Sequence, residues 1–502
     1  MKERIHIVWF KRDLRTHDHA PLHVANSRGK VLPLYVVEID YWQLPDASAR
    51  HWRFIRQSLH ELNTALSRLG QPLVKMHGDM LTVLATLHER FDIAGLYSHQ
   101  ETGNRWIRTR DYNVAQWCAQ HGIEWQEFQP FGVVRRGQNQ DGGVNLWEQF
   151  TQQECLPAPA RLLPLQTRIP QSGLPDSLST TLAQTESRHC QTGGRSEALK
   201  LLGSFLRERG QHYQHDMATP QAAINHGSRL GPHLAYGTLS LREVTHKLRT
   251  TSAQMEGDTD WQRSLRAFDA RLRWHCQSIQ QLENTPQIET DNVQAVFDGW
   301  REPDFNPVYF AAWRDGMTGF PLIDAAMRAL RHCGWLSFRL RALLVSFAAN
   351  QLWLHWQQPA WHLAQCFTDY EPGIHYLQVQ MHAGTAALNT LRIYHPVRQS
   401  LELDPQGAFI RHWLPELADV PEQYLHEPWA MPYSVQQQAA CVLGVDYPEP
   451  VIDPKATARQ ARAKFRELRR CHPELWAQAG GLGRKHTKQP STSADTTQIN
   501  LF

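Results

Sequence analysis

Residues 311–356 read AAWRDGMTGFPLIDAAMRALRHCGWLSFRLRALLVSFAANQLWLHW, and this stretch decides the fold class of the larger part of the chain. Gly319-Phe320-Pro321 predicts a helix start, because proline is tolerated in a first turn, and Gly334 predicts the end of that helix. Arg341 follows among apolar residues. An unpaired buried charge is costly. The stretch therefore predicts a helical core in which Arg341 has an acceptor, and Asp369 is the candidate.

A second pair of charges lies in the same stretch. Asp324 and Arg328 are four residues apart, a spacing that places two side chains on one face of a helix. One interpretation of the charges in this core is a set of structural salt bridges. The other is a clamp around a polar heterocyclic ligand.

The first 130 residues predict an α/β domain. Between the predicted strands, residues 50–70 carry apolar side chains at helical spacing. Strands that alternate with helices favour a parallel, Rossmann-like sheet covered on both faces. No GxGxxG motif follows the first strand, so the dinucleotide fingerprint is absent. The predicted strands are 4–10, 31–39, 73–79, 93–99 and 123–128.

The rest of the chain predicts three further regions. Residues 131–195 are rich in Pro, Gln, Ser, Thr and Gly, which is typical of a long linker lying over the surface. Residues 196–480 predict an all-helical domain, beginning with the amphipathic stretch SEALKLLGSFLRERGQHY. Residues 481–502 have the polar composition of a disordered tail.

Composition narrows the class of protein. Hydrophobic residues make up 41% and charged residues 20% of the 502, as in ordinary globular proteins. No apolar run reaches bilayer length, and the start MKERIHIVWF lacks the features of a signal peptide. No two of the eight cysteines lie within four residues of each other, which argues against a zinc knuckle but leaves widely spaced iron–sulfur ligands open. We expect a monomeric cytoplasmic protein without a membrane segment.

The distribution of charged residues concerns binding to a polyanion such as nucleic acid. The net charge of +3 is too small to indicate nucleic acid binding by itself. Residues 458–476, ARQARAKFRELRRCHPELW, would form a helix with a basic face. A solvated face is the common interpretation of such a pattern, and a surface that follows phosphates is the more specific one.

Several motifs together resemble the photolyase/cryptochrome family. The resemblance extends over residues 5–430, and the combination is far more specific than any single motif. The matching segments are VWFKRDLRTHDHAPL (8–22), GSRLGPHLAYGTLS (227–240), TGFPLIDAAMRAL (318–330), GWLSFRLR (334–341), LRIYHPVRQSLELDPQGAFIRHWLPEL (391–417) and HEPW (426–429).

The resemblance implies a helical domain that binds FAD. The family's ion pair beside the flavin ring corresponds to Arg341 and Asp369. An aromatic wall of the pocket that receives a damaged base corresponds to Trp274. The residues that would meet the FAD phosphates are Tyr213, Ser228 and Leu230.

The pocket departs from the family pattern. Members that repair cyclobutane pyrimidine dimers usually carry Glu where Arg271 stands, and Asn where Phe338 and His375 stand. Arg271 could stabilise a reduced pyrimidine through its charge. His375 could donate a proton if its pKa lies near neutrality, as chemistry on (6-4) photoproducts would need, or it could be a structural histidine.

The electron relay of the family is also incomplete here. Trp356 and Trp313 match its middle and outer tryptophans, but the region YLQVQMHAGTAALN contains no tryptophan nearest the flavin. Another route could run through Trp353, Trp335 or Tyr376.

The resemblance implies blue-light-dependent repair of UV-damaged DNA by reduced FAD. The alternatives are a cryptochrome-like photoreceptor and a DNA-binding flavoprotein without repair activity. An antenna chromophore, either a pterin or a flavin, is also implied in the N-terminal domain. Glu101 stands at the end of a predicted strand, where α/β sheets bind ligands.

The chain ends QINLF after a polar stretch. This ending resembles the peptide with which bacterial polymerases and repair proteins bind the sliding clamp. Gln498 would hydrogen-bond at the edge of an apolar pocket, and Leu501 and Phe502 would fill it. The clamp is therefore a predicted partner.

Overall fold

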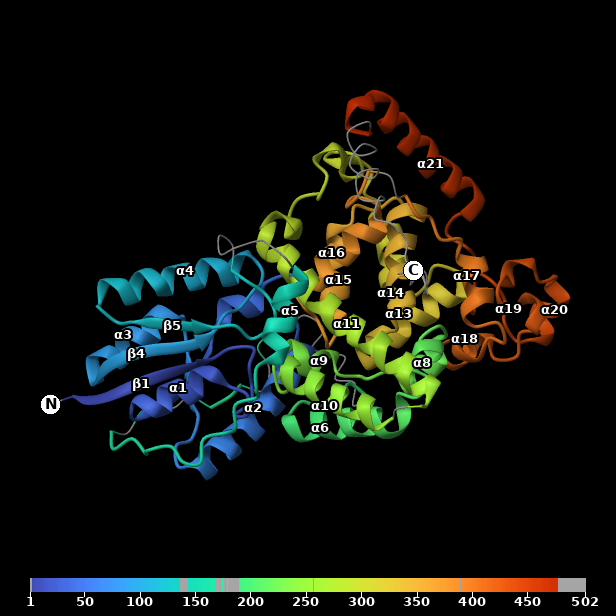
Figure 1. Cartoon of the computed structure of the whole chain (residues 1–502). Helices are drawn as coiled ribbons and strands as arrows, with labels where there is room; N and C mark the ends of the chain where they lie inside the picture. Colours follow the sequence, from blue (N-terminus) through green and yellow to red (C-terminus); the bar gives the residue numbers. More distant parts are fainter. Residues whose placement is uncertain are drawn as a thin grey trace, which may run out of the picture.

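The computed structural model describes residues 2–135, 143–167, 169, 173–175, 178, 189–255, 257–388 and 391–476. Figure 1 shows a layered α/β part followed by a larger helical part. The predicted fold class is confirmed. The limits placed at residues 130, 195 and 480 stay a prediction. No helix in the described part of the chain is long and apolar enough to cross a bilayer.

The α/β part contains one parallel sheet of five strands in the order β3-β2-β1-β4-β5. The inner strands are continuous apolar runs, as expected where both faces of a parallel sheet are buried. The strands are β1 (Glu3–Phe10), β2 (Val31–Val37), β3 (Val74–His77), β4 (Phe91–His99) and β5 (Trp125–Phe128). All five predicted strands are present, each within two residues of its predicted ends.

Helices cover both faces of the sheet (Figure 1). Side chains of β1 alternate between two buried clusters, as a pleated strand requires. Val8 and Phe10 pack with α1 (Ala20–Arg28) and α2 (Ala49–Leu69). Ile7 packs in the opposite cluster with α3 (Met80–Arg90) and α4 (Arg105–Gln120).

The predicted linker is not free of secondary structure. Helix α5 (Gly143–Gln152) lies within it. Trp147 and Phe150 of α5 are buried against α10 (Leu241–Gln254) and α11 (Thr259–Asn284) of the helical part. The Pro- and Gln-rich flanks hid this helix, because it is only ten residues long and its few apolar residues stand within a polar stretch.

Apart from a single bridge between Leu443 and Tyr447, the described residues after 195 contain no strand. The helices are α6 (Arg195–Ser204), α7 (Tyr213–Asp216), α8 (Pro220–His226), α9 (Gly231–Ala235), α10 (Leu241–Gln254), α11 (Thr259–Asn284), α12 (Pro307–Asp315), α13 (Pro321–Cys333), α14 (Phe338–Ser346), α15 (Gln357–Cys366), α16 (Pro372–Ala383), α17 (Pro396–Leu403), α18 (Ala408–Trp413), α19 (Glu422–Leu425), α20 (Tyr433–Gln438) and α21 (Pro454–Cys471). Short π-helical turns follow α6 (Phe205–Arg209) and α14 (Phe347–Gln351). The 3-10 turns are Ile39–Gln43, Pro286–Glu289, Ala295–Phe297, Glu302–Asp304, Pro415–Leu417 and Pro428–Ala430.

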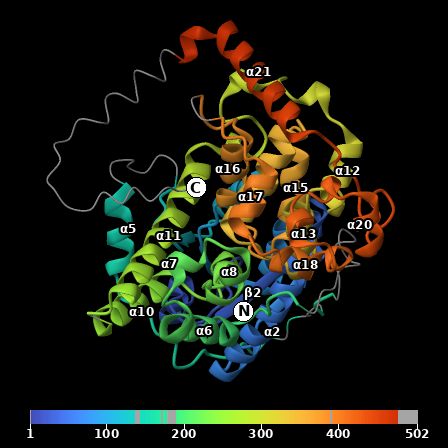
Figure 2. The same ribbon diagram turned by 90° about the vertical axis from the view of Figure 1, so that its right-hand side faces the viewer.

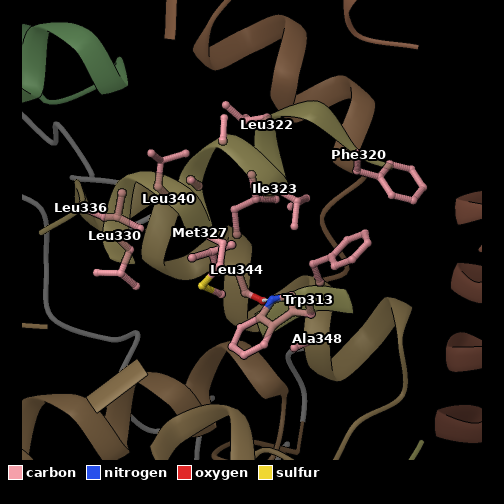
Figure 3. Close-up of a cluster of buried hydrophobic side chains, with 14 of the residues drawn as sticks. Trp313, Phe320, Leu322, Ile323, Met327, Leu330, Leu336, Leu340, Leu344 and Ala348 are labelled. Atoms are coloured by element: carbon pink, nitrogen blue, oxygen red, sulfur yellow. Dashed lines mark hydrogen bonds between the residues drawn. The ribbon is translucent and has the colours of Figure 1, made fainter. Parts of the chain in front are cut away.

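Helices α13 and α14 form the centre of the largest apolar cluster, as the opening stretch predicts. Helix α13 begins at Pro321 and ends before Gly334, whose φ of +70° suits glycine at a helix C-terminus. Figure 3 shows the packed side chains of this cluster, among them Trp313, Phe320, Leu322, Ile323, Met327, Leu330, Leu336, Leu340, Leu344 and Ala348.

The predicted pairing of Asp324 with Arg328 is wrong. The buried Asp324 carboxylate accepts hydrogen bonds from Thr318, from the Gly319 N–H and from the Tyr447 hydroxyl at 2.7 Å. Burial raises the pKa of Asp324 to about 6. Arg328 pairs with Glu416 at 2.7 Å instead. Tertiary partners outcompete the i,i+4 contact, which is worth only a few tenths of a kcal/mol.

Arg50 of α2 joins the α/β part to two helix ends of the helical part. Its guanidinium donates to the carbonyls of Leu330 and Arg331, near the C-terminus of α13, at 3.0 and 2.5 Å. It also donates to the carbonyl of Cys366, the last residue of α15. Carbonyls at a helix C-terminus lack intrahelical donors, and a cation there is favoured by the helix dipole. Arg50 therefore caps two helices at once.

The segment after α15 is fixed by further side chains of the α/β part. His51 Nε2 lies 3.0 Å from the Ala364 carbonyl and 2.9 Å from the Phe367 carbonyl. Arg12 donates to the Tyr370 carbonyl at 3.0 Å and pairs with Glu371 at 2.9 Å. The α/β part thus positions residues 364–371.

We predict that Arg50→Met lowers the free energy of unfolding by about 2–4 kcal/mol, because it leaves three buried carbonyls without their charged donor. Chemical unfolding followed by circular dichroism measures this change. The control is Arg68→Met at the exposed end of α2, expected within about 0.5 kcal/mol of the wild type. Equal effects of the two substitutions would contradict the capping role.

Candidate functional site

A cavity of about 680 Å³ opens among helices of the helical part. Its walls come from α7, the turn before α9, α11, α14, α16 and the segment 363–371. This volume is within the range of cofactor and substrate sites. The cavity is lined by all five predicted cofactor-binding residues, Tyr213, Ser228, Leu230, Arg341 and Asp369, and by the predicted substrate-pocket residues Arg271, Trp274 and His375.

Arg341 and Asp369 form the predicted ion pair inside this cavity. Arg341 Nη2 lies 2.8 Å from Asp369 Oδ2, and its Nε donates to the Leu336 carbonyl at 3.0 Å. The second carboxylate oxygen, Asp369 Oδ1, is buried and has no hydrogen-bond partner among the described residues. An orphaned buried acceptor is costly, so this oxygen suits a ligand that donates an N–H or O–H.

Close packing brings the turn before α9 against this pair. A Cβ at Gly231 would lie 2.7 Å from Asp369 Oδ2, so glycine is required there. Ser228 and Leu230 line the cavity beside it. Between them, Arg229 adopts a φ of +59°, and its guanidinium lies 4.3 Å from the centre of the Trp335 ring. Arg229 stands inside the segment GSRLGPHLAYGTLS but is not among the predicted site residues.

Trp274 and Arg271 converge on Phe338 at the α11–α14 side of the cavity. The Trp274 and Phe338 rings are edge to face, with centroids 6.3 Å apart. The Arg271 guanidinium lies 5.5 Å from the Phe338 centroid. Among the described residues no carboxylate pairs with Arg271. Two aromatic faces and an unneutralised cation suit a flat, electron-accepting ring.

His375 lines the cavity but is not poised as an acid at neutral pH. Its Nε2 donates to the Ala360 carbonyl at 2.9 Å, and its ring contacts Tyr370 at a centroid distance of 5.3 Å. Burial lowers the pKa of His375 to about 4. The imidazole is therefore neutral at pH 7. Proton donation would need a pKa near neutrality, and His375 does not have one.

Trp313 and Trp356 lie in the core outside the cavity lining. Both are almost completely buried, at 0% and 1% exposure. Trp313 Nε1 donates to the Leu344 carbonyl at 3.1 Å, and Trp356 Nε1 donates to Asn292 at 2.8 Å. The Tyr376 ring lies 6.4 Å from the Trp356 ring.

The other two candidates for the electron route lie elsewhere. Trp335 lines the cavity beneath Arg229. Trp353 packs against Trp300, 4.7 Å between centroids.

The eight cysteines do not assemble into a metal site. All lie in the described part of the chain and all are free. Within that part, the only group of three or more metal-ligand side chains is Asp13 with His19 and His99. In this group both imidazoles hydrogen-bond to Asp13 Oδ2, at 2.9 and 2.7 Å. The structure thus gives no support to the iron–sulfur alternative.

The crevice at the carboxyl ends of β1 and β4, the switch point of the sheet, is filled by charged side chains. Glu101 pairs with Arg110 at 2.7 Å, and Arg110 also pairs with Glu38 and Asp111 at 3.0 and 2.8 Å. The free volume next to Glu101 is only about 20 Å³. An antenna chromophore at this crevice would require these ion pairs to separate.

The predicted basic helix is α21. Figures 1 and 2 place it at the edge of the helical part. Ala458 and Ala461 are buried on its inner face. The outer face exposes a stripe of arginines at helical spacing, namely Arg459, Arg462, Arg466, Arg469 and Arg470. Residues 477–502, which include the predicted clamp peptide, lie outside the described residues.

Comparison with known proteins agrees with this architecture. Residues 6–153 match the model of the DNA photolyase family, and residues 268–467 match that of the FAD binding domain of DNA photolyase. The deoxyribodipyrimidine photo-lyase of Escherichia coli (strain K12) is 30% identical, with 93% of this chain and 99% of that protein aligned. The cryptochrome DASH of Gloeobacter violaceus is 28% identical, with 90% and 94% aligned.

The fold also matches a solved structure. The archaeal photolyase of Sulfolobus tokodaii, solved with two FAD molecules, superimposes with a TM-score of 0.73 at 24% identity, over 92% of this chain and 99% of that one. The chain therefore belongs to the photolyase/cryptochrome family and contains the family's FAD-binding domain.

Proposed function

We propose that this protein is a blue-light-dependent DNA-repair enzyme that splits UV-induced pyrimidine lesions. The main support is one cavity that contains both the Arg341–Asp369 pair and a separate aromatic–cation wall of Trp274, Phe338 and Arg271. One part of such a cavity suits the cofactor and the other an extruded base.

FAD fits the part of the cavity that contains the Arg341–Asp369 pair. Asp369 Oδ1 would accept a hydrogen bond from the flavin ring, and Arg341 would hold that carboxylate in place. Tyr213, Ser228 and Leu230 would face the phosphates. When bound and reduced, FAD supplies one electron under blue light.

The wall formed by Trp274, Phe338 and Arg271 fits a damaged pyrimidine. Photolyases belong to the enzymes that extrude their target nucleotide from the duplex. Trp274 and Phe338 would stack on the extruded rings, and the Arg271 cation would stabilise the negative charge that an added electron brings. His375 stays a candidate specificity residue because it lines the cavity. Its Nε2 is hydrogen-bonded to the Ala360 carbonyl, which fixes the orientation of the ring.

Two alternatives keep specific support. A photoreceptor role is supported by the 28% identity to a cryptochrome DASH. DNA binding without repair is supported by Arg271 at the position where dimer-repairing members carry Glu. A second flavin, as in the Sulfolobus tokodaii structure, would act as the antenna that the family resemblance implies.

We predict light-dependent restoration of one of two substrates, oligonucleotides with a cyclobutane dimer or with a (6-4) photoproduct, and about a tenfold to hundredfold lower kcat/KM for Arg271→Gln. The assay uses photoreduced protein with FAD bound. Arg273→Gln is the control, because Arg273 is on the same helix but pairs with Glu148 and Asp269. Arg271→Glu tests whether dimer repair depends on that position.

No restoration of either lesion by the FAD-loaded protein would contradict the proposal and favour the photoreceptor. Equal losses in Arg271→Gln and Arg273→Gln would remove Arg271 from the lesion site.

The C-terminal peptide remains a proposed contact with the sliding clamp of the replication machinery, which would also place the protein in the cytoplasm with DNA. A labelled peptide of residues 488–502 should bind the clamp saturably, since Leu501 and Phe502 would fill an apolar pocket. Replacement of Gln498, Leu501 and Phe502 by alanine should abolish that binding. Unsaturable binding of the unaltered peptide would exclude this partner.

A further inference from the structure

Two buried tyrosines share one carboxylate between the α/β and helical parts. The Tyr370 hydroxyl donates to Asp46 Oδ2 at 2.5 Å, and the Tyr376 hydroxyl donates to the same oxygen at 3.2 Å. All three side chains belong to residues that are no more than 3% exposed. Asn104 Nδ2 also donates to Asp46, at 3.3 Å. Within the described residues, no cation forms an ion pair with this carboxylate.

The cluster extends from the cavity toward the core tryptophans. Tyr370 lines the cavity together with Asp369. The Tyr370 and Tyr376 rings are 6.5 Å apart between centroids, and the Tyr376 and Trp356 rings are 6.4 Å apart. Three oxidisable rings therefore form a continuous series from the cavity to Trp356, in a chain that lacks the family's innermost tryptophan.

The protons of this cluster have a defined acceptor. Burial raises the pKa of both Tyr370 and Tyr376 well above the usual value, so both phenols keep their protons at pH 7. A phenol can lose an electron at moderate cost only if its proton leaves with it. Asp46 lies within hydrogen-bond distance of both hydroxyls and can take that proton.

A similar pair elsewhere offers a structural comparison. Tyr447 donates to the buried Asp324 at 2.7 Å, but neither residue lines the cavity. Asp324 also receives two backbone N–H groups and a threonine hydroxyl, whereas the side-chain donors to Asp46 among the described residues are two phenols and one amide. The Asp46 cluster is thus set apart by its place beside the cavity and by its two redox-active donors.

We propose that Tyr370, Tyr376 and Asp46 form a proton-coupled electron relay that delivers electrons to the flavin cavity. The inference rests on FAD binding in that cavity but not on which lesion is repaired. The relay would replace the missing innermost tryptophan and would return the cofactor to its reduced state after an oxidation.

The steps balance in charge and atoms. Tyr370 would give one electron to the light-excited oxidised flavin, which is the oxidant, and the Tyr370 O–H bond would break as its proton moves to Asp46. Tyr370 becomes a neutral radical and Asp46 a neutral acid. Tyr376 then passes one electron to Tyr370, Asp46 returns its proton to Tyr370, and Asp46 takes the proton of Tyr376. An external one-electron reductant such as a thiol would give an electron to the Tyr376 radical, which regains its proton from Asp46, while the thiol becomes a thiyl radical and releases its own proton to water.

The test is a light flash on protein with oxidised FAD, followed by transient absorption and electron paramagnetic resonance. We expect the spectrum of a neutral tyrosyl radical in the wild type, and slower formation in D₂O. The long-lived radical should be lost in Tyr376→Phe, and the solvent isotope effect should be lost in Asp46→Asn. Tyr447→Phe is the matched control and should behave as the wild type.

A wild-type spectrum of tryptophanyl radical alone, with unchanged photoreduction in Tyr376→Phe, would overturn the relay. FAD content and the melting temperature of each variant show whether it is folded. If Asp46→Asn does not fold, Asp46→Glu and Tyr370→Phe decide the question: the first should keep the radical and the second should lose it. Repair by chemically reduced protein is measured separately, so failure of the relay and failure of the repair proposal are distinguishable.

Discussion

The structure depends on the contact between the α/β part and the end of α15. Arg50 donates to the Cys366 carbonyl and His51 to the Ala364 carbonyl, both in the last turn of α15, where carbonyls lack intrahelical donors. The two residues after this helix end bring the chain to Asp369, which carries the free carboxylate oxygen of the cavity. The sheet domain therefore has a structural role in the proposed flavin site, in addition to any role as an antenna.

This arrangement explains why the polar residues cluster where they do. Arg12 and Asp46 both contact Tyr370 in the same segment. Arg12 donates to the Tyr370 carbonyl, and Asp46 accepts from the Tyr370 hydroxyl. Buried charges are tolerated here because each has several hydrogen-bond partners. The same contacts bring Asp46 within reach of two tyrosines, so a structural junction also provides a proton acceptor beside the cavity.

Much of the fold could be predicted from the sequence, because alternating strands and helices and the α13–α14 stretch have strong local patterns. The Arg341–Asp369 pair was predictable from the family resemblance. The wrong Asp324–Arg328 pair shows where local spacing fails, since the real partners, Tyr447 and Glu416, are about 90 to 120 residues away. The contacts of Arg50 with α13 and α15 span 280 residues or more, and no sequence pattern marks them.

The most direct test of this account is the affinity for FAD of Asp369→Ala compared with that of the wild type, measured by flavin fluorescence quenching. Asp404→Ala is the control, because the Asp404 carboxylate accepts the N–H groups of Phe409 and Ile410 at the start of α18 and does not line the cavity. The account predicts that the wild type binds FAD in this cavity and that binding is at least about tenfold weaker in Asp369→Ala, equal to ~1.4 kcal/mol. Unchanged affinity in Asp369→Ala would contradict the assignment of this cavity to the flavin.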